Sequence, residues 1–155
     1  MLVESTTICL TGKDLVSLIK RNLSQNTPIN NIAVQITDDS IIVSGKYKAS
    51  IMKKELDIPF QATFHLNTSG RVIGFELVHL RAARFPLDKL RSILLTLLTR
   101  RIPQICGIQR TKNGLRCDVD EALGNCGVRA QIEKLVLLPN PDQLLIEFSG
   151  SLELA

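Results

Sequence analysis

Hydrophobic and polar residues alternate in the segment from Asn31 to Leu77, and this is the clearest pattern in the chain. Apolar side chains recur at every second position in four runs, which are separated by turn residues such as Asp38-Asp39 and Asn67-Thr68-Ser69-Gly70. A period of two is typical of strands that have one buried and one solvent-facing side. We therefore predict an antiparallel meander of four long strands.

Two segments with a helical period flank the predicted meander. TGKDLVSLIKRNLS has its apolar residues on one side, with Thr11 as an N-cap and Asp14 three residues later in a variant of the capping box, and it predicts a helix from Lys13 to Leu23. RFPLDKLRSILLTLLTRRIP predicts a second helix, because Pro86 suits a first helical turn and Pro103 ends the pattern.

The second helix is expected to cover the apolar face of the meander. It is too short to span a membrane, since Leu87 to Thr99 rises only about 20 Å at 1.5 Å per residue, whereas the hydrocarbon core of a bilayer is about 30 Å thick. Asp88, Lys89 and Arg91 also make one side of it polar.

The last third of the chain predicts two hairpins. Gly107 to Val119 forms the first, through the turn signal Lys112-Asn113-Gly114. A helical turn from Asp120 to Leu123 follows, and the second hairpin joins Val128 to Leu138 with Leu144 to Leu154. Together with the earlier elements, this order predicts an α+β fold.

Composition supports one folded domain over residues 1–155. The chain is 45% hydrophobic and 22% charged, which excludes disorder and allows a substantial core. Aromatic residues are few, with five Phe, one Tyr and no Trp. A surface that stacks bases is therefore not expected, and this argues against nucleic acid as a partner.

Basic residues form clusters in a chain of formal net charge +4. We predict that they meet anionic headgroups, with peripheral contact to an anionic membrane; the ordinary alternative is a solvated face. These residues are Lys46, Lys48, Lys53 and Lys54 around one predicted turn, and Arg100 and Arg101 at the end of the second helix.

No pattern typical of a catalytic, nucleotide-binding or metal site occurs in the sequence. The four cysteines lack the close, repeated spacing of zinc ligands. His65 is expected opposite about Val72, and His79 several residues further along the strand pair, so that the two do not share a metal. We predict a protein that is not an enzyme and uses no cofactor.

Two remaining features have structural interpretations. Asp118, Asp120 and Glu121 are expected to cap the helical turn that follows them. The N-terminus MLVESTTICLTGKD lacks the basic patch and the long apolar run of an export signal, which favours a cytoplasmic location.

Four segments carry a resemblance that spans Leu10 to Val119. They are LTGKDLVSLIKRNL, VQITDDSIIVSGKY, LDIPFQATFHLNTSGRVIGFEL and FPLDKLRSILLTLLTRRIP. In this order they resemble the LmeA-like phospholipid-binding family, which is similar in style to tubular lipid-binding domains. The resemblance implies a long, curved meander sheet wrapped around the apolar helix, with a groove for acyl chains. Proteins of that family usually carry an export signal or a membrane anchor, and this sequence departs from them there.

The resulting hypothesis is a lipid or other apolar small molecule bound in a groove between sheet and helix. The alternative is a solid core, in which case the chain acts as a protein–protein interaction or scaffold domain, for example as a homodimer. The sequence leaves open whether the helix fills the concave face or leaves room beside it. The candidate groove residues are Phe60, Phe64, Ile73, Phe75, Leu77, Leu90, Leu94 and Leu97.

Overall fold

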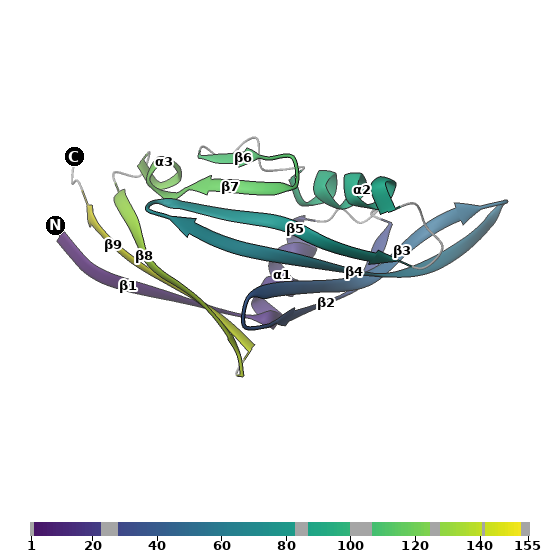
Figure 1. Cartoon of the computed structure of the whole chain (residues 1–155), viewed down its shortest axis with the longest axis horizontal. Coiled ribbons are helices and arrows are strands. Elements are labelled where there is room, and N and C mark those ends of the chain that lie inside the picture. Colours follow the sequence, from purple (N-terminus) through teal and green to yellow (C-terminus); the bar gives the residue numbers. More distant parts are fainter. Residues whose placement is uncertain are drawn as a thin grey trace.

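The protein has an α+β fold built mostly from antiparallel strands in two open sheets (Figure 1). The computed structural model describes residues 2–22, 28–82, 87–99, 107–124, 128–140 and 142–152. The predicted α+β class and its antiparallel meander are confirmed.

The larger sheet has six strands in the order β2-β3-β4-β5-β7-β6. Its first four strands follow one another along the chain, as the alternation of apolar and polar residues predicts. The predicted hairpin at Asn113-Gly114 supplies the last two, and β7 pairs with β5. The strands are β2 (Ile29–Ile36), β3 (Ser40–Ile51), β4 (Lys54–Ser69), β5 (Val72–Ala82), β6 (Ile108–Arg110) and β7 (Gly114–Asp118).

The smaller sheet has three strands in the order β1-β9-β8. The predicted C-terminal hairpin forms β8 (Val128–Pro139) and β9 (Asp142–Leu152). The sequence pattern did not predict β1 (Leu2–Thr11), which pairs with β9 from Leu2 opposite Ser151 to Thr11 opposite Gln143. Leu2 and Ser151 therefore lie at the same end of this sheet (Figure 1).

Three helices connect the strands in the parts of the chain that the structure describes. Helix α1 (Gly12–Asn22) corresponds to the helix expected from Lys13, α2 (Leu87–Thr99) to the predicted cover helix, and α3 (Val119–Gly124) to the predicted helical turn. The backbone N–H of Glu121 donates a hydrogen bond to Asp118 Oδ1 over 3.1 Å. Asp118 thus caps α3, as its place before the helix predicts.

The core of the described residues consists of three apolar clusters. The first joins α2 to the larger sheet through Phe60, Phe64, Leu77, Leu90 and Leu94, among others. The second joins the two sheets and α1 around Ile36, Ile41 and Leu144. The third lies between α3 and the smaller sheet around Val119 and Ile132. The space between α1 and α2 borders the first two clusters.

Candidate functional site

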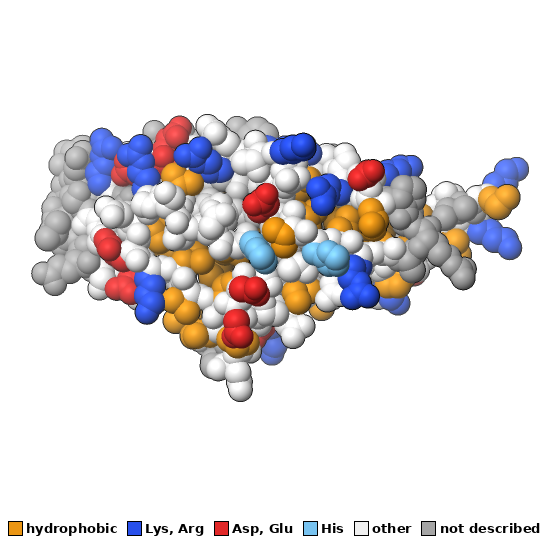
Figure 2. Space-filling view, viewed as in Figure 1, with side chains coloured by type: hydrophobic (Ala, Val, Ile, Leu, Met, Phe, Trp, Pro, Cys, Tyr) orange, Lys and Arg blue, Asp and Glu red, His pale blue; other side chains and the backbone are white. Residues whose placement is uncertain are grey.

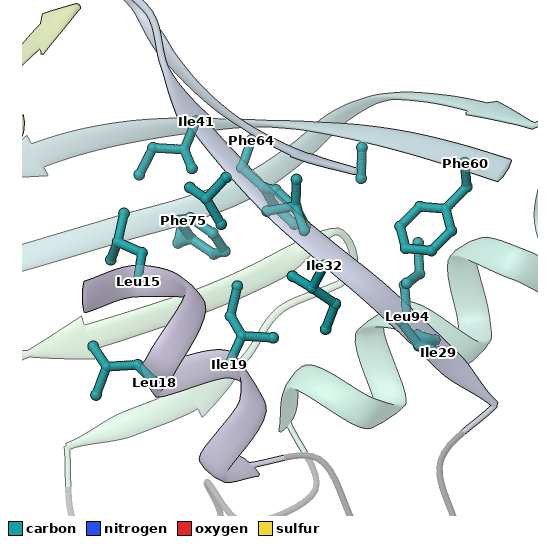
Figure 3. A pocket seen from close by; sticks show the side chains of 13 residues that line it. Leu15, Leu18, Ile19, Ile29, Ile32, Ile41, Phe60, Phe64, Phe75 and Leu94 are labelled. Carbon is teal, nitrogen blue, oxygen red and sulfur yellow. The ribbon is translucent and has the colours of Figure 1, made fainter. Parts of the chain in front are cut away.

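An apolar cavity of about 160 Å³ lies between α1, α2 and the larger sheet (Figure 3). Every described residue that lines it is apolar, so this part of the chain offers a ligand contact surface but no charged or hydrogen-bonding side chain. The lining residues are Leu15, Leu18, Ile19, Ile29, Ile32, Val34, Ile41, Val43, Phe60, Ala62, Phe64, Phe75 and Leu94.

The sheet side of the cavity follows from the period of two along its strands. Residues two apart point to the same face, which is why Ile32 and Val34 of β2 line it together, as do Phe60, Ala62 and Phe64 of β4. The lining thus comes mainly from the buried face of the predicted meander.

Two phenylalanines form a rigid part of this wall. The rings of Phe64 and Phe75 stack with centroids 4.5 Å apart and planes 7° from parallel. A third ring, that of Phe60, lies over Gly45, where a Cβ atom would come within 3.1 Å of it. Glycine at this position therefore leaves room for the Phe60 ring beside the cavity.

Helix α1 forms the opposite wall and is held at its first turn. Thr11 Oγ1 accepts a hydrogen bond from the Asp14 N–H over 3.2 Å, and Asp14 Oδ2 accepts one from the Thr11 N–H over 2.8 Å. These bonds complete the predicted capping box. The Thr11 hydroxyl also donates a hydrogen bond to Asp14 Oδ2 over 2.8 Å. The backbone N–H and the hydroxyl of Thr11 both donate to the Asp14 carboxylate, and they lower its pKa because they stabilise the charged form.

Asp142 fixes where α1 begins relative to both sheets. Its Oδ1 accepts a hydrogen bond from the backbone N–H of Ile36 over 2.6 Å. A Cβ atom on Gly12 would overlap the same carboxylate, so the start of α1 approaches β9 closely because residue 12 is glycine. Further along α1, Leu18 lines the cavity while 43% exposed, so the cavity reaches the surface beside it.

The structure brings together part of the predicted groove. Phe60, Phe64, Phe75 and Leu94 line the cavity. Leu77 and Leu90 belong to the same core cluster but pack tightly at the contact between α2 and the sheet. Ile73 lies apart from them, in the cluster around Val119 and Ile132. The side chain of Leu97 lies outside the described residues.

Sequence reasoning did not assign the cavity residues of α1 and β2. Leu15, Leu18 and Ile19 were recognised only as the apolar side of an amphipathic helix, and Ile32 and Val34 only as the apolar face of a strand. The periodic pattern showed which face of the helix and of the strand is apolar, but no local pattern indicates that α1 lies beside α2.

The four predicted lysines do not surround the cavity. Lys53 and Lys54 lie at the far end of the β3–β4 hairpin, and Lys54 is six residues, or about 20 Å of extended strand, from Phe60. Lys46 and Lys48 neighbour Gly45 and Tyr47, whose cross-strand partners are Phe60 and Ile58, so they point to the opposite face of the sheet. Arg100 and Arg101 lie outside the described residues.

The histidine register differs from the expected one. His65 pairs with Glu76 and not with Val72, and His79 pairs with Thr63, because the β4–β5 turn is centred on Gly70 and Arg71 and the pair contains a bulge at Thr63 and Phe64. The two histidines are therefore closer along the sheet than expected. Within the described residues, however, no group of three or more His, Cys, Asp or Glu side chains is arranged to hold a metal.

The carboxylates beside α3 form ion pairs with two arginines. Arg71 forms ion pairs with Asp118 over 3.2 Å and with Asp120 over 3.5 Å, and Arg129 pairs with Asp120 over 3.2 Å. Burial, with a smaller effect of the adjacent Asp118 carboxylate, raises the pKa of the Cys117 thiol. A raised pKa disfavours the thiolate, so this cysteine is a poor nucleophile.

None of the helices in the described parts of the chain is long and apolar enough to cross a membrane. This agrees with the length argument made for α2, which has 13 residues.

Comparison with models of protein families, with curated proteins and with solved structures found no match.

Proposed function

We propose that this protein binds an apolar ligand, such as the acyl chain of a lipid, in the cavity between α1, α2 and the larger sheet, and that it does so without catalysis. The observation that carries the proposal is a cavity of about 160 Å³ whose described lining residues are all apolar. The pocket is not fully enclosed, and apolar surface that stays in contact with water costs about 25 cal/mol per Å² relative to burial. A bound hydrocarbon chain recovers part of that energy.

The size of the cavity limits what it holds. An engineered apolar cavity of about 150 Å³ accommodates benzene, so this one suits the end of a single acyl chain rather than a whole phospholipid. Burial contributes about 0.8 kcal/mol per CH₂ group. The rest of the acyl chain extends out of the cavity past Leu18, where the cavity reaches the surface. A sheet curved around α2, as the family resemblance implies, is part of this proposal.

Mass spectrometry tests the proposal directly. Protein purified without detergent is measured under native conditions, and its organic extract is analysed for fatty acids and phospholipids. We expect a bound species with an acyl chain, or uptake of added fatty acid by an empty protein. A protein that is empty and also fails to take up fatty acid or phospholipid contradicts the proposal.

A matched pair of variants locates the site. Val43→Phe places a ring in the cavity, because Val43 lines it, whereas Val78→Phe makes the same change at a side chain that is 42% exposed and does not line it. We expect fatty acid uptake to fall at least tenfold in Val43→Phe and to stay unchanged in Val78→Phe. Equal uptake by both variants places the ligand elsewhere.

A scaffold function is the second candidate, and the edge of the smaller sheet favours it. Strand β1 is an edge strand, and its Ile8 side chain is 44% exposed. Edge strands readily pair with another chain, so a homodimer through β1 is the form to test. Light scattering across a concentration series distinguishes the two candidates: a stable dimer that takes up no fatty acid favours the scaffold.

A further inference from the structure

The β3–β4 hairpin extends away from the rest of the molecule. Its strands pair without interruption from Ser40 opposite His65 to Ile51 opposite Lys54. The hairpin ends beyond the helices and the other strands (Figure 1), and Lys or Arg side chains surround hydrophobic atoms at that end (Figure 2). The apex is therefore accessible to a large, flat partner without a clash with the body of the protein.

The turn at the apex has an unusual sequence. Met52 and Lys53 are its two central residues, with φ of 51° and 63°, as a type I′ turn requires. Asn-Gly is the preferred pair for such a turn, because positive φ is unfavourable for residues with a large side chain. The backbone at Met52 and Lys53 is therefore locally strained, and such strain is typical of functional positions.

The apex combines an apolar side chain with cations. Met52 is 92% exposed, and Leu56 on the adjoining strand is 48% exposed. Lys48 forms a 3.9 Å ion pair with Glu55, whereas no ion pair of Lys53 or Lys54 occurs among the described residues. An exposed apolar side chain beside unneutralised lysines matches the interface of an anionic bilayer, where phosphates lie directly above hydrocarbon. Nucleic acid matches the lysines but not the methionine.

We propose that the apex of the β3–β4 hairpin, Met52 to Lys54, docks on an anionic lipid bilayer. Met52 enters the boundary between headgroups and acyl chains, and Lys53 and Lys54 contact lipid phosphates. Docking rests on the proposed function, because the membrane is then the source of the apolar ligand that the cavity binds. The apex lies about 20 Å of strand from the cavity, so docking leaves the cavity unobstructed.

Vesicle sedimentation tests the docking site. The full chain is mixed with vesicles of phosphatidylcholine, with and without phosphatidylglycerol, at low and high salt. We expect binding to the anionic vesicles that weakens with salt. Met52→Asn removes the apolar contact and is compatible with the turn, and it should reduce partitioning about tenfold. Lys53→Asn/Lys54→Gln should reduce it about fivefold for each lysine removed.

A control variant removes an exposed apolar side chain elsewhere. Leu123 of α3 is 37% exposed, and Leu123→Asn should leave vesicle binding unchanged. Because asparagine suits the turn, Met52→Asn should also have a thermal midpoint no lower than that of the wild type, so its loss of binding does not reflect unfolding. A wild type that does not bind anionic vesicles, or a Met52→Asn variant that binds as well as the wild type, overturns the docking site. Equal loss in Leu123→Asn overturns it too.

The two proposals fail in different ways. Met52→Asn should still take up fatty acid from solution, and Val43→Phe should still bind anionic vesicles. Fatty acid uptake without vesicle binding by the wild type overturns only the docking site. Duplex DNA is tested with the wild type and with Met52→Asn. If both proteins bind DNA as strongly as they bind anionic vesicles, the lysines are assigned to nucleic acid and the membrane docking site is overturned.

Discussion

Helices α1 and α2 lie against the same apolar face of the larger sheet but pack on it differently. On α2, Leu90, Leu94 and Leu95 are buried, and Leu90 is completely inaccessible to solvent. On α1, Leu15 and Ile19 are only half-buried and Leu18 is exposed. The α2 leucines are buried against the sheet and only Leu94 of α2 is among the described cavity residues, whereas Leu15, Leu18 and Ile19 of α1 line the cavity.

The difference shows that a cavity depends on how a helix is attached and not only on its apolar residues. Helix α1 is held at its first turn by the capping box of Thr11 and Asp14. Gly12 also lies close to Asp142 there. Burial of leucines along its length holds α2. A helix fixed at one end can leave space along the rest of its length, and a ligand can use that space.

The largest expected change in the free energy of unfolding is for a residue at the contact between α2 and the sheet. Leu90→Ala should lower the free energy of unfolding by about 3 kcal/mol, because it removes buried methyl groups and leaves a cavity. Leu18→Ala should lower it by less than about 1 kcal/mol, because the side chain is already exposed. Urea unfolding measures both values. Similar losses in the two variants would show that α1 packs as firmly as α2.

Phe75→Leu tests the part of the cavity wall that the larger sheet supplies. Loss of the ring stack with Phe64 should destabilise the protein by about 1 kcal/mol, and the smaller side chain should enlarge the cavity. We expect longer fatty acids to gain affinity relative to shorter ones in a competition assay. Phe148→Leu, in the cluster around Val119 and Ile132, is the matched control and should not change this preference. An unchanged preference in Phe75→Leu argues against Phe75 as part of the ligand site.

Local sequence patterns predicted the elements of the fold well. The alternation from Ile32 to Leu77 identified the meander, and the Asn113-Gly114 turn and the caps at Thr11 and Asp118 were recognised from short-range chemistry. Each of these features depends on residues that are close in the sequence.

The features that depend on distant residues were not predicted. Strand β1 alternates poorly, with Glu4 and Thr6 between Leu2 and Ile8, and its pairing with β9 at the other end of the chain defines it. The cavity depends on the gap between α1 and α2, whereas a periodic pattern shows only which face of each helix is apolar.

The attachment of α1 can be weakened at its cap. Thr11→Ala removes the side chain that accepts the Asp14 N–H and should destabilise the protein by about 1 kcal/mol. Because α1 is a wall of the cavity, fatty acid uptake should weaken as well, and Thr11→Ser should restore both properties. Ser17→Ala, which removes only a hydrogen bond to the Lys13 carbonyl, is the control within the helix. Unaltered uptake in Thr11→Ala would mean that the cap does not position the wall.

The smallest effect concerns the charge of Asp14. Its pKa lies below the ordinary value of 3.8, because the Thr11 backbone N–H and hydroxyl stabilise the carboxylate. The stability that this charge adds is therefore fully present above the unfolded-state pKa, and it is lost as the pH falls through the lower folded-state pKa. Asp14→Asn keeps an acceptor for Thr11 but does not titrate. The thermal midpoint of the wild type should exceed that of Asp14→Asn near neutral pH, and the difference should shrink below about pH 4. A difference that stays constant in acid would show that the capping box depends on geometry and not on charge, and the hold on α1 would then be independent of pH.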